Sequence, residues 1–88
     1  MGGSDGGQRL ARAIGEQIAE RRRSKGLSQE GLARMAGMSR ETVRRAEAGE
    51  RMPRWVTLAK LAECLDIRLT DLVALATAVE HPTSGGRR

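Results

Sequence analysis

The sequence predicts an all-α domain of five helices, and three observations support this fold class. The 88 residues include one tryptophan and no phenylalanine or tyrosine, so the core must consist of Leu, Ile, Val, Met and Ala, which favour helix packing over a sheet sandwich. Apolar residues recur at three- and four-residue spacing, and glycines and serines stand where helices of ordinary length would end and begin. We expect one domain at 9–80 between flexible Gly- and Ser-rich tails at 1–8 and 81–88.

The first helix is expected from Arg9 to Ser24. Its inward positions repeat at helical spacing and are Leu10, Ala11, Ile14 and Ile18. The basic cluster RRRSK is favourable at a helix C-terminus, and Gly26 provides the stop.

Two short helices and a tight turn follow. Ser28 should cap a helix over 29–36, and Ser39 should cap the next, which ends at Gly49. The residues expected to be buried in this region are Leu32, Ala33, Ala36, Met38, Val43 and Ala46. Because only AGMS separates the two helices, they must cross steeply, as in a helix-turn-helix unit.

The fourth and fifth helices complete the domain. After the loop GERMPR, a helix from about residue 54 or 55 to 65 should bury Leu58, Leu61, Ala62 and Leu65. Thr70 should cap the fifth helix, at 71–79, with Asp71 at its positive end. This helix carries more apolar surface than one side can hide, so we expect part of it to complete the core and part to face a partner. The expected core positions are Leu69, Leu72 and Val73, and the expected partner positions are Leu75, Ala76 and Val79.

Composition excludes several classes of protein. Cys64 is the only cysteine and His81 the only histidine, so one chain can form neither a disulfide nor a Cys/His zinc site, and we expect no metal and no cofactor. We interpret Cys64 as an inert thiol packed in the protein and His81 as a residue without a functional role. No nucleophile and base set or phosphate-binding loop indicates an enzyme. Without a membrane span or signal peptide, the protein is expected to be cytoplasmic.

The distribution of charge favours a polyanionic partner. Residues 1–54 carry twelve basic and seven acidic groups (+5), residues 55–80 carry two and four (−2), and Arg87 and Arg88 add +2. Such asymmetry directs the first half of the chain toward a nucleic acid.

The third helix divides into two faces at 100° per residue. Val43, Ala46 and Glu47 fall on one side. The long polar residues on the other side are Arg40, Glu41, Arg44 and Arg45. Arginine can bridge O6 and N7 of guanine and glutamate can accept from the amino group of cytosine, so this face suits a DNA major groove. A solvated face with internal pairs between Glu41 and Arg44 or Arg45 explains the same residues equally well.

A family resemblance favours the first interpretation. The run from about 14 to 75 resembles the lambda repressor and Cro type of helix-turn-helix proteins, also called the XRE family. The matching motifs are GLSQEGLARMAGMS, the T-V that follows at the start of the third helix, EAGE at its end, and TLAKLAECLDIRLTDL. The resemblance implies a five-helix lambda-repressor-like domain that binds double-stranded DNA.

Individual roles also follow from the resemblance. It implies base readout by Arg40, Glu41, Arg44 and Arg45. Gln29 matches a glutamine that bonds a DNA phosphate and supports the recognition helix, and Thr42 matches a polar position beside the sugar-phosphate chain. Arg51 and Arg54 flank the loop after the third helix and are expected to contact phosphates. Arg22 and Glu47 match a largely buried ion pair between the first and third helices.

Two positions depart from the family pattern. Ala46 stands where a larger apolar residue is usual, and Trp55 stands where a leucine is usual after the loop proline. We predict that Trp55 leans over Ala46 and fills the volume, with an exposed tryptophan at an interface as the alternative.

These observations predict a sequence-specific, repressor-like transcriptional regulator that binds a near-palindromic operator as a homodimer and associates with the nucleoid when bound. The alternative is an antitoxin or adaptor of a toxin-antitoxin-like system, whose main partner would be a protein.

Overall fold

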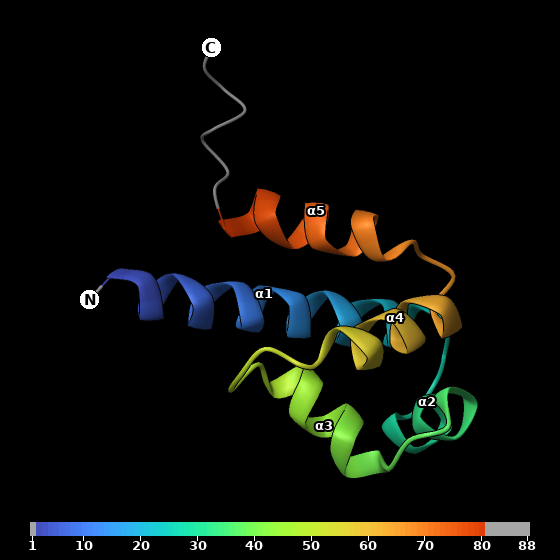
Figure 1. The fold of residues 1–88 in the computed structure, drawn as a ribbon. Helices are drawn as coiled ribbons and strands as arrows, with labels where there is room; N and C mark the ends of the chain where they lie inside the picture. Colours follow the sequence, from blue (N-terminus) through green and yellow to red (C-terminus); the bar gives the residue numbers. More distant parts are fainter. Residues whose placement is uncertain (1, 81–88) are drawn as a thin grey trace.

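The structure is a computed structural model that describes the backbone of residues 2–80 and the side chains of residues 6–78. Over this range the chain forms five α-helices and no strand, as predicted (Figure 1). The helices are α1 (Gly2–Ser24), α2 (Gln29–Ala36), α3 (Arg40–Ala48), α4 (Trp55–Cys64) and α5 (Leu69–Glu80). Among these described residues, no helix is both long enough and apolar enough to cross a membrane.

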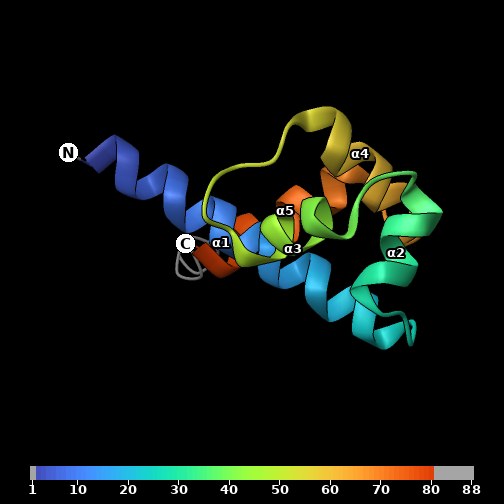
Figure 2. The ribbon, with the colours of Figure 1, turned by 90° about the horizontal axis from the view of Figure 1, so that it is seen from below.

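The long helix α1 is the centre of the fold. It packs against α5 on one side and against α3 on another, while α2 packs against α3 and α4. Figure 2 shows α3 lying across α1, with α2 and α4 beside it. The largest fully buried side chains are Ile14, Ile18, Leu32, Val43, Leu61, Leu65 and Leu72. One aliphatic core therefore joins all five helices.

The predicted caps position α2 and α3. The Ser28 hydroxyl accepts a hydrogen bond from the backbone N–H of Gly31 at 2.9 Å, and the Ser39 hydroxyl accepts one from Thr42 at 3.1 Å. Gly37 and Gly49 end the two helices in the left-handed conformation, with φ of 69° and 66°. Because each cap satisfies one otherwise unpaired backbone group at its helix end, the caps fix where the turn between α2 and α3 begins and ends.

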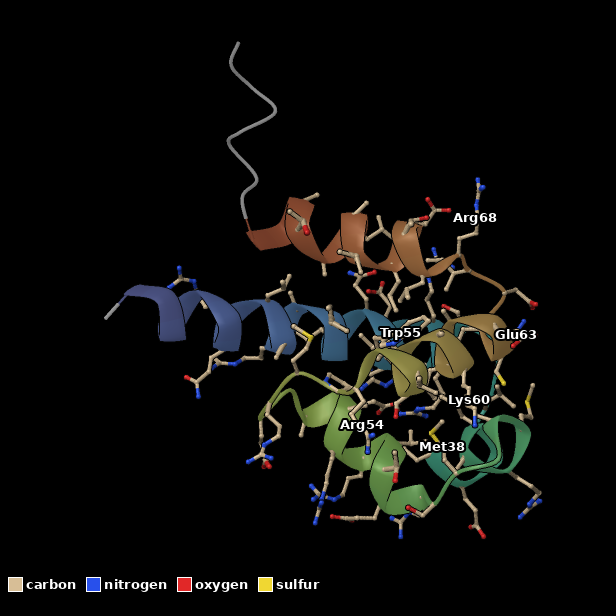
Figure 3. All side chains as sticks on the ribbon, viewed as in Figure 1. Met38, Arg54, Trp55, Lys60, Glu63 and Arg68 are labelled. Carbon is tan, nitrogen blue, oxygen red and sulfur yellow. The ribbon has the colours of Figure 1, made fainter. Side chains whose placement is uncertain are left out.

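The contact between α1 and α3 corrects the prediction for Trp55. A Cβ at Gly15 would lie 2.5 Å from the carbonyl oxygen of Glu47 and 2.6 Å from that of Ala46, so the two backbones touch at this point. The α3 backbone at Ala46 is therefore held close to α1 at Gly15, and Ala46 itself is 3% exposed. Trp55 does not cover Ala46. Its side chain is 70% exposed at the start of α4 (Figure 3).

Two helix boundaries differ from the prediction. Helix α1 begins at Gly2 rather than Arg9, although the added segment contains four glycines, which disfavour a helix. A Cβ at Gly6 or Gly7 would meet no atom within 4 Å, so this end of α1 extends beyond the packed domain. Helix α5 begins at Leu69, so Thr70 lies inside the helix and is not its cap. The carbonyl of Arg68 accepts the first helical hydrogen bond, from Leu72, at 2.9 Å.

The burial of α5 requires a further correction. Ala76 is fully buried, so it belongs to the core and not to a surface that could face a partner. It lies one turn after Leu72, which is also fully buried, and both side chains therefore fall on the same side of α5. Leu75 is 39% exposed and remains available. The side chain of Val79 and the whole of segment 81–88, which includes His81, lie outside the described residues.

Cys64 packs against the core as a half-buried thiol. Burial is the main cause that raises its pKa, with smaller contributions from Glu63 and Asp66. A thiol with a raised pKa is less reactive, in agreement with a packing role.

Candidate nucleic-acid interface

Helix α3 presents the predicted division between a buried and a charged face. Val43 is fully buried and Ala46 is 3% exposed, so these two residues fix the helix against the core. The four residues predicted to read bases are all exposed and are Arg40, Glu41, Arg44 and Arg45. Because α3 lies at the surface (Figure 2), its charged side is open to a large partner.

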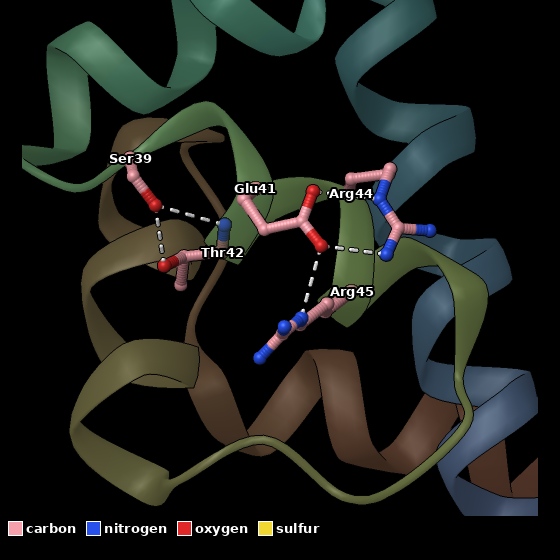
Figure 4. A network of polar contacts seen from close by, with 5 residues as sticks. All are labelled: Ser39, Glu41, Thr42, Arg44 and Arg45. Atoms are coloured by element: carbon pink, nitrogen blue, oxygen red, sulfur yellow. Dashed lines mark hydrogen bonds and ion pairs between the residues drawn. The ribbon is translucent and has the colours of Figure 1, made fainter.

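Glu41 joins two of the three arginines on this face. Its carboxylate accepts hydrogen bonds from Nε and Nη2 of Arg44 at 2.9 and 2.7 Å, and from Nε of Arg45 at 3.0 Å. Figure 4 shows the carboxylate between the two guanidinium groups. The hydrogen bonds from Arg44, and to a smaller extent that from Arg45, lower the pKa of Glu41 to about 2. In turn, the hydrogen bonds that Arg44 donates to Glu41 raise the pKa of Arg44. The internal pairs considered from the sequence are therefore present in the unbound protein.

A nearly buried ion pair joins α3 to α1. Nε of Arg22 lies 2.6 Å from Oε2 of Glu47, and Nη2 donates to Oε1 at 3.1 Å. The side chains are only 12% and 7% exposed. The hydrogen bond to Glu47 is the main cause that raises the pKa of Arg22. Arg22 also donates to the carbonyl of Leu27 at 2.7 Å, so one guanidinium ties α1 to α3 and to the chain entering α2.

Gln29 extends this support to α2. Its amide nitrogen donates to Oε1 of Glu47 at 2.9 Å. Glu47 thus accepts hydrogen bonds from both Arg22 and Gln29, and it has a structural position instead of a base-facing one. Gln29 is half-buried, at the edge of the α3 face. The sequence identified Gln29 only through the resemblance, because nothing local indicated that its amide would reach Glu47.

The residues predicted to contact phosphates surround the charged face. Thr42 shares a 2.9 Å hydroxyl contact with Ser39 at the start of α3, so its side chain is held beside the cap. Arg51 and Arg54 are exposed on the loop after α3. They line a hollow together with Thr42, Arg44 and Arg45. The structure therefore brings four arginines to one side of α3.

A second hollow lies on the other side of α3, and sequence reasoning missed it. Its charged lining residues are Glu16, Glu20, Arg23, Arg44 and Glu47. From the sequence, Arg23 in the run RRRSK had no expected role beyond the helix end, yet it lines this hollow beside α3. Within the part of the chain that the structure describes, no group of His, Cys, Asp and Glu side chains could hold a metal ion.

The fold and the arginine-rich exposed helix define a small helix-turn-helix protein, and comparisons with known proteins agree. The helix-turn-helix family model matches residues 18–72. The chain is 34% identical over 64 residues to the uncharacterized HTH-type transcriptional regulator y4dJ of Sinorhizobium fredii, covering 73% of this chain and 83% of the relative.

Two solved structures are similar to this fold. The restriction-modification controller protein C.AhdI from Aeromonas hydrophila is 41% identical, with a TM-score of 0.65 over 72% of this chain and 94% of that chain. The clp gene regulator ClgR from Corynebacterium glutamicum has a TM-score of 0.76 over 86% and 81% of the two chains, and at 21% identity it shows the fold alone. The chain belongs to the XRE-type helix-turn-helix family and is a DNA-binding transcriptional regulator.

Proposed function

We propose that the protein occupies a specific, near-palindromic operator as a homodimer and acts as a repressor. The observation that carries this proposal is the exposed face of α3, where three arginines and Glu41 lie on a helix that the Arg22–Glu47 pair holds rigidly from behind. A regulator of this kind acts in the cytoplasm and associates with the nucleoid when it is bound to DNA.

The arginines of α3 would read bases in the major groove. A guanidinium presents paired N–H groups that match O6 and N7 of guanine, and one good pair of this kind is worth about 1–3 kcal/mol of discrimination between bases. Glu41 can accept from the amino group of a cytosine. The proposed operator half-site is therefore rich in G·C pairs where α3 enters the groove.

Groups around the face would fix the register by contacting phosphates. Arg51 and Arg54 approach from the loop, and Thr42 and Gln29 lie at the starts of α3 and α2. Helix starts carry unpaired N–H groups that favour a phosphate. These contacts carry no sequence information of their own, but they orient the arginines over the base edges.

Dimerisation would set the spacing of the operator. Two recognition helices about 34 Å apart meet the major groove one turn of DNA apart, which demands a site with two-fold symmetry. The exposed Leu75 supports an apolar contact with a second copy, and Val79 is predicted to lie nearby. Trp55, at 70% exposure, supports the alternative in which the tryptophan takes part in an interface.

Selection of binding sites from random double-stranded oligonucleotides tests this proposal. We expect enrichment of one sequence with two symmetric, G·C-containing half-sites about one helical turn apart. Enrichment of a single half-site would contradict the dimer. If no sequence were enriched over the starting pool, the proposal of sequence-specific regulation would be wrong.

A further inference from the structure

The way in which Glu41 holds its two arginines leaves part of each arginine free. Arg44 uses Nε and Nη2, and Arg45 uses Nε alone. A guanidinium has five N–H groups, so the terminal edge formed by Nη1 and Nη2 still has a hydrogen to offer from each nitrogen. That edge can form the paired contact to guanine while the other edge stays on Glu41.

We propose that Glu41 is a positioning residue that sets the discrimination between specific and non-specific DNA, by holding Arg44 and Arg45 in place and by cancelling one of their two charges. This inference rests on the proposed function and deepens it. Glu41 then contributes to specificity mainly through the arginines, even where no cytosine lies opposite it.

Charge supplies the first part of the argument. Non-specific affinity comes almost entirely from cations on phosphates, and each phosphate contact changes the logarithm of affinity by about 0.9 per logarithm of salt concentration. With Glu41 ionised, the trio of Glu41, Arg44 and Arg45 has a net charge of +1 instead of +2. The low pKa of Glu41 agrees with a carboxylate that stays charged at neutral pH. A phosphate that takes either arginine away must also displace the carboxylate from it.

Positioning supplies the second part. An arginine side chain loses considerable rotamer freedom when it is fixed, and this loss opposes binding unless it has already occurred in the free protein. Arg45 is 71% exposed and Arg44 is 44% exposed, and Glu41 is the residue to which both side chains donate hydrogen bonds. Figure 4 shows that Glu41 reaches both from the preceding turn of the same helix. On the correct bases the arginines therefore bind without first being ordered, whereas on random DNA the same restraint weakens their contacts with phosphates.

Arg40 differs from its two neighbours. Over the described part of the chain no hydrogen bond or ion pair involves its side chain, although it lies on the same exposed face. It is the cation of this face that can reach a phosphate without displacing a carboxylate. The face therefore combines one free arginine with two restrained ones.

Equilibrium binding of Glu41→Gln tests the inference. The probes are the duplex enriched by the wild-type protein and a duplex of the same length and base composition in shuffled order. We expect the variant to bind the shuffled duplex about 3–10-fold more tightly, with a salt slope steeper by up to about one unit. Affinity for the selected duplex should stay the same or fall, so the ratio of specific to non-specific affinity decreases.

Two further variants separate charge from position. Glu63→Gln removes the same charge from an exposed residue of α4, away from α3 (Figure 3), and should leave the ratio unchanged. Glu41→Asp keeps the charge but shortens the side chain by one methylene. Its ratio of specific to non-specific affinity should be intermediate between those of the wild type and Glu41→Gln. An Asp variant indistinguishable from the wild type would overturn the positioning role.

The outcomes also separate this inference from the proposed function. If the wild type prefers its selected duplex and Glu41→Gln behaves as Glu63→Gln does, the inference is wrong and the proposed function stands. If the wild type binds both duplexes equally, both are wrong. Thermal unfolding of each variant by circular dichroism ensures that only folded proteins are compared.

Discussion

Replacing Arg22 by methionine should destabilise the domain by about 3–4 kcal/mol. The guanidinium makes two hydrogen bonds to Glu47 and one to the carbonyl of Leu27, and both charged side chains are nearly buried. Removal of one partner from a buried pair typically costs about 3–5 kcal/mol, because the remaining charge is left without compensation. We place the loss in the lower half of this range, since Glu47 keeps the hydrogen bond from Gln29 and methionine preserves the apolar stem of the side chain.

Urea unfolding followed by far-UV circular dichroism measures this loss. At about 0.05–0.15 kcal/mol per residue, a chain of this length has about 4–13 kcal/mol in total, so the loss is about a quarter or more of the total and should clearly lower the urea midpoint. Arg34→Met is the matched control. Its pair with Glu30 has a 3.6 Å separation and side chains 78% and 69% exposed, so its loss should stay below about 0.5 kcal/mol.

A double variant tests the cause of the loss. Arg22→Met with Glu47→Leu removes both charges together, and we expect it to recover most of the stability, since a buried pair can often be exchanged for apolar residues at little cost. If Arg22→Met lost less than about 1 kcal/mol, or if the double variant were the less stable of the two, the buried pair would not be what fixes α3 to α1.

Four further outcomes are expected. Arg44→Ala should lower affinity for the selected duplex by about tenfold or more with little effect on shuffled DNA, whereas Arg54→Ala should weaken both and flatten the salt slope by about one unit; equal losses on all sequences would contradict base readout. Gly15→Ala should cost about 1–3 kcal/mol in urea unfolding, because its Cβ would lie 2.5 Å from a carbonyl oxygen of α3. Trp55→Ala should change the unfolding free energy of the monomer by about 0.5 kcal/mol or less, and a loss as large as that of a core truncation would show that the indole packs. The depressed pKa of Glu41 means that its contribution to stability is present above pH 4.5 and is lost as the pH falls toward about 2; an NMR titration that returned its ordinary value of 4.5 would contradict the hydrogen bonds to the arginines.

Local features were predictable from the sequence because their causes are local. Ser28 and Ser39 cap their helices, and Gly37 and Gly49 end them, at the expected residues. Val43 and Ala46 face inward because a helix repeats every 3.6 residues. The same repeat predicts that Ala76 is buried, since Leu72 and Ala76 are one turn apart and must share a face.

Contacts between distant segments were predicted less well. The Arg22–Glu47 pair was available only through the family resemblance, because 25 residues separate its members and no local pattern joins them. The error at Trp55 arose from an assumption of fixed spacing between helices. The prediction placed a large side chain over the small Ala46, whereas Gly15 allows the α1 and α3 backbones to meet and Trp55 stays exposed. A glycine inside a helix gives no sign of what will approach it.

The two glutamates of α3 show why burial decides what an ion pair does. Glu47 and Glu41 each hold arginine at hydrogen-bonding distance, but Glu47 is 7% exposed and Glu41 is 51% exposed. In the buried pair, separation leaves a charge without water, so the pair stays closed and α3 keeps its position. In the exposed group, separation costs less because water reaches the charges, so the terminal edges of the arginines can adjust to a base while Glu41 still disfavours their transfer to a phosphate. The helix is therefore rigid where it meets the protein and adaptable where it would meet DNA, which is the combination that a search over many wrong sites requires.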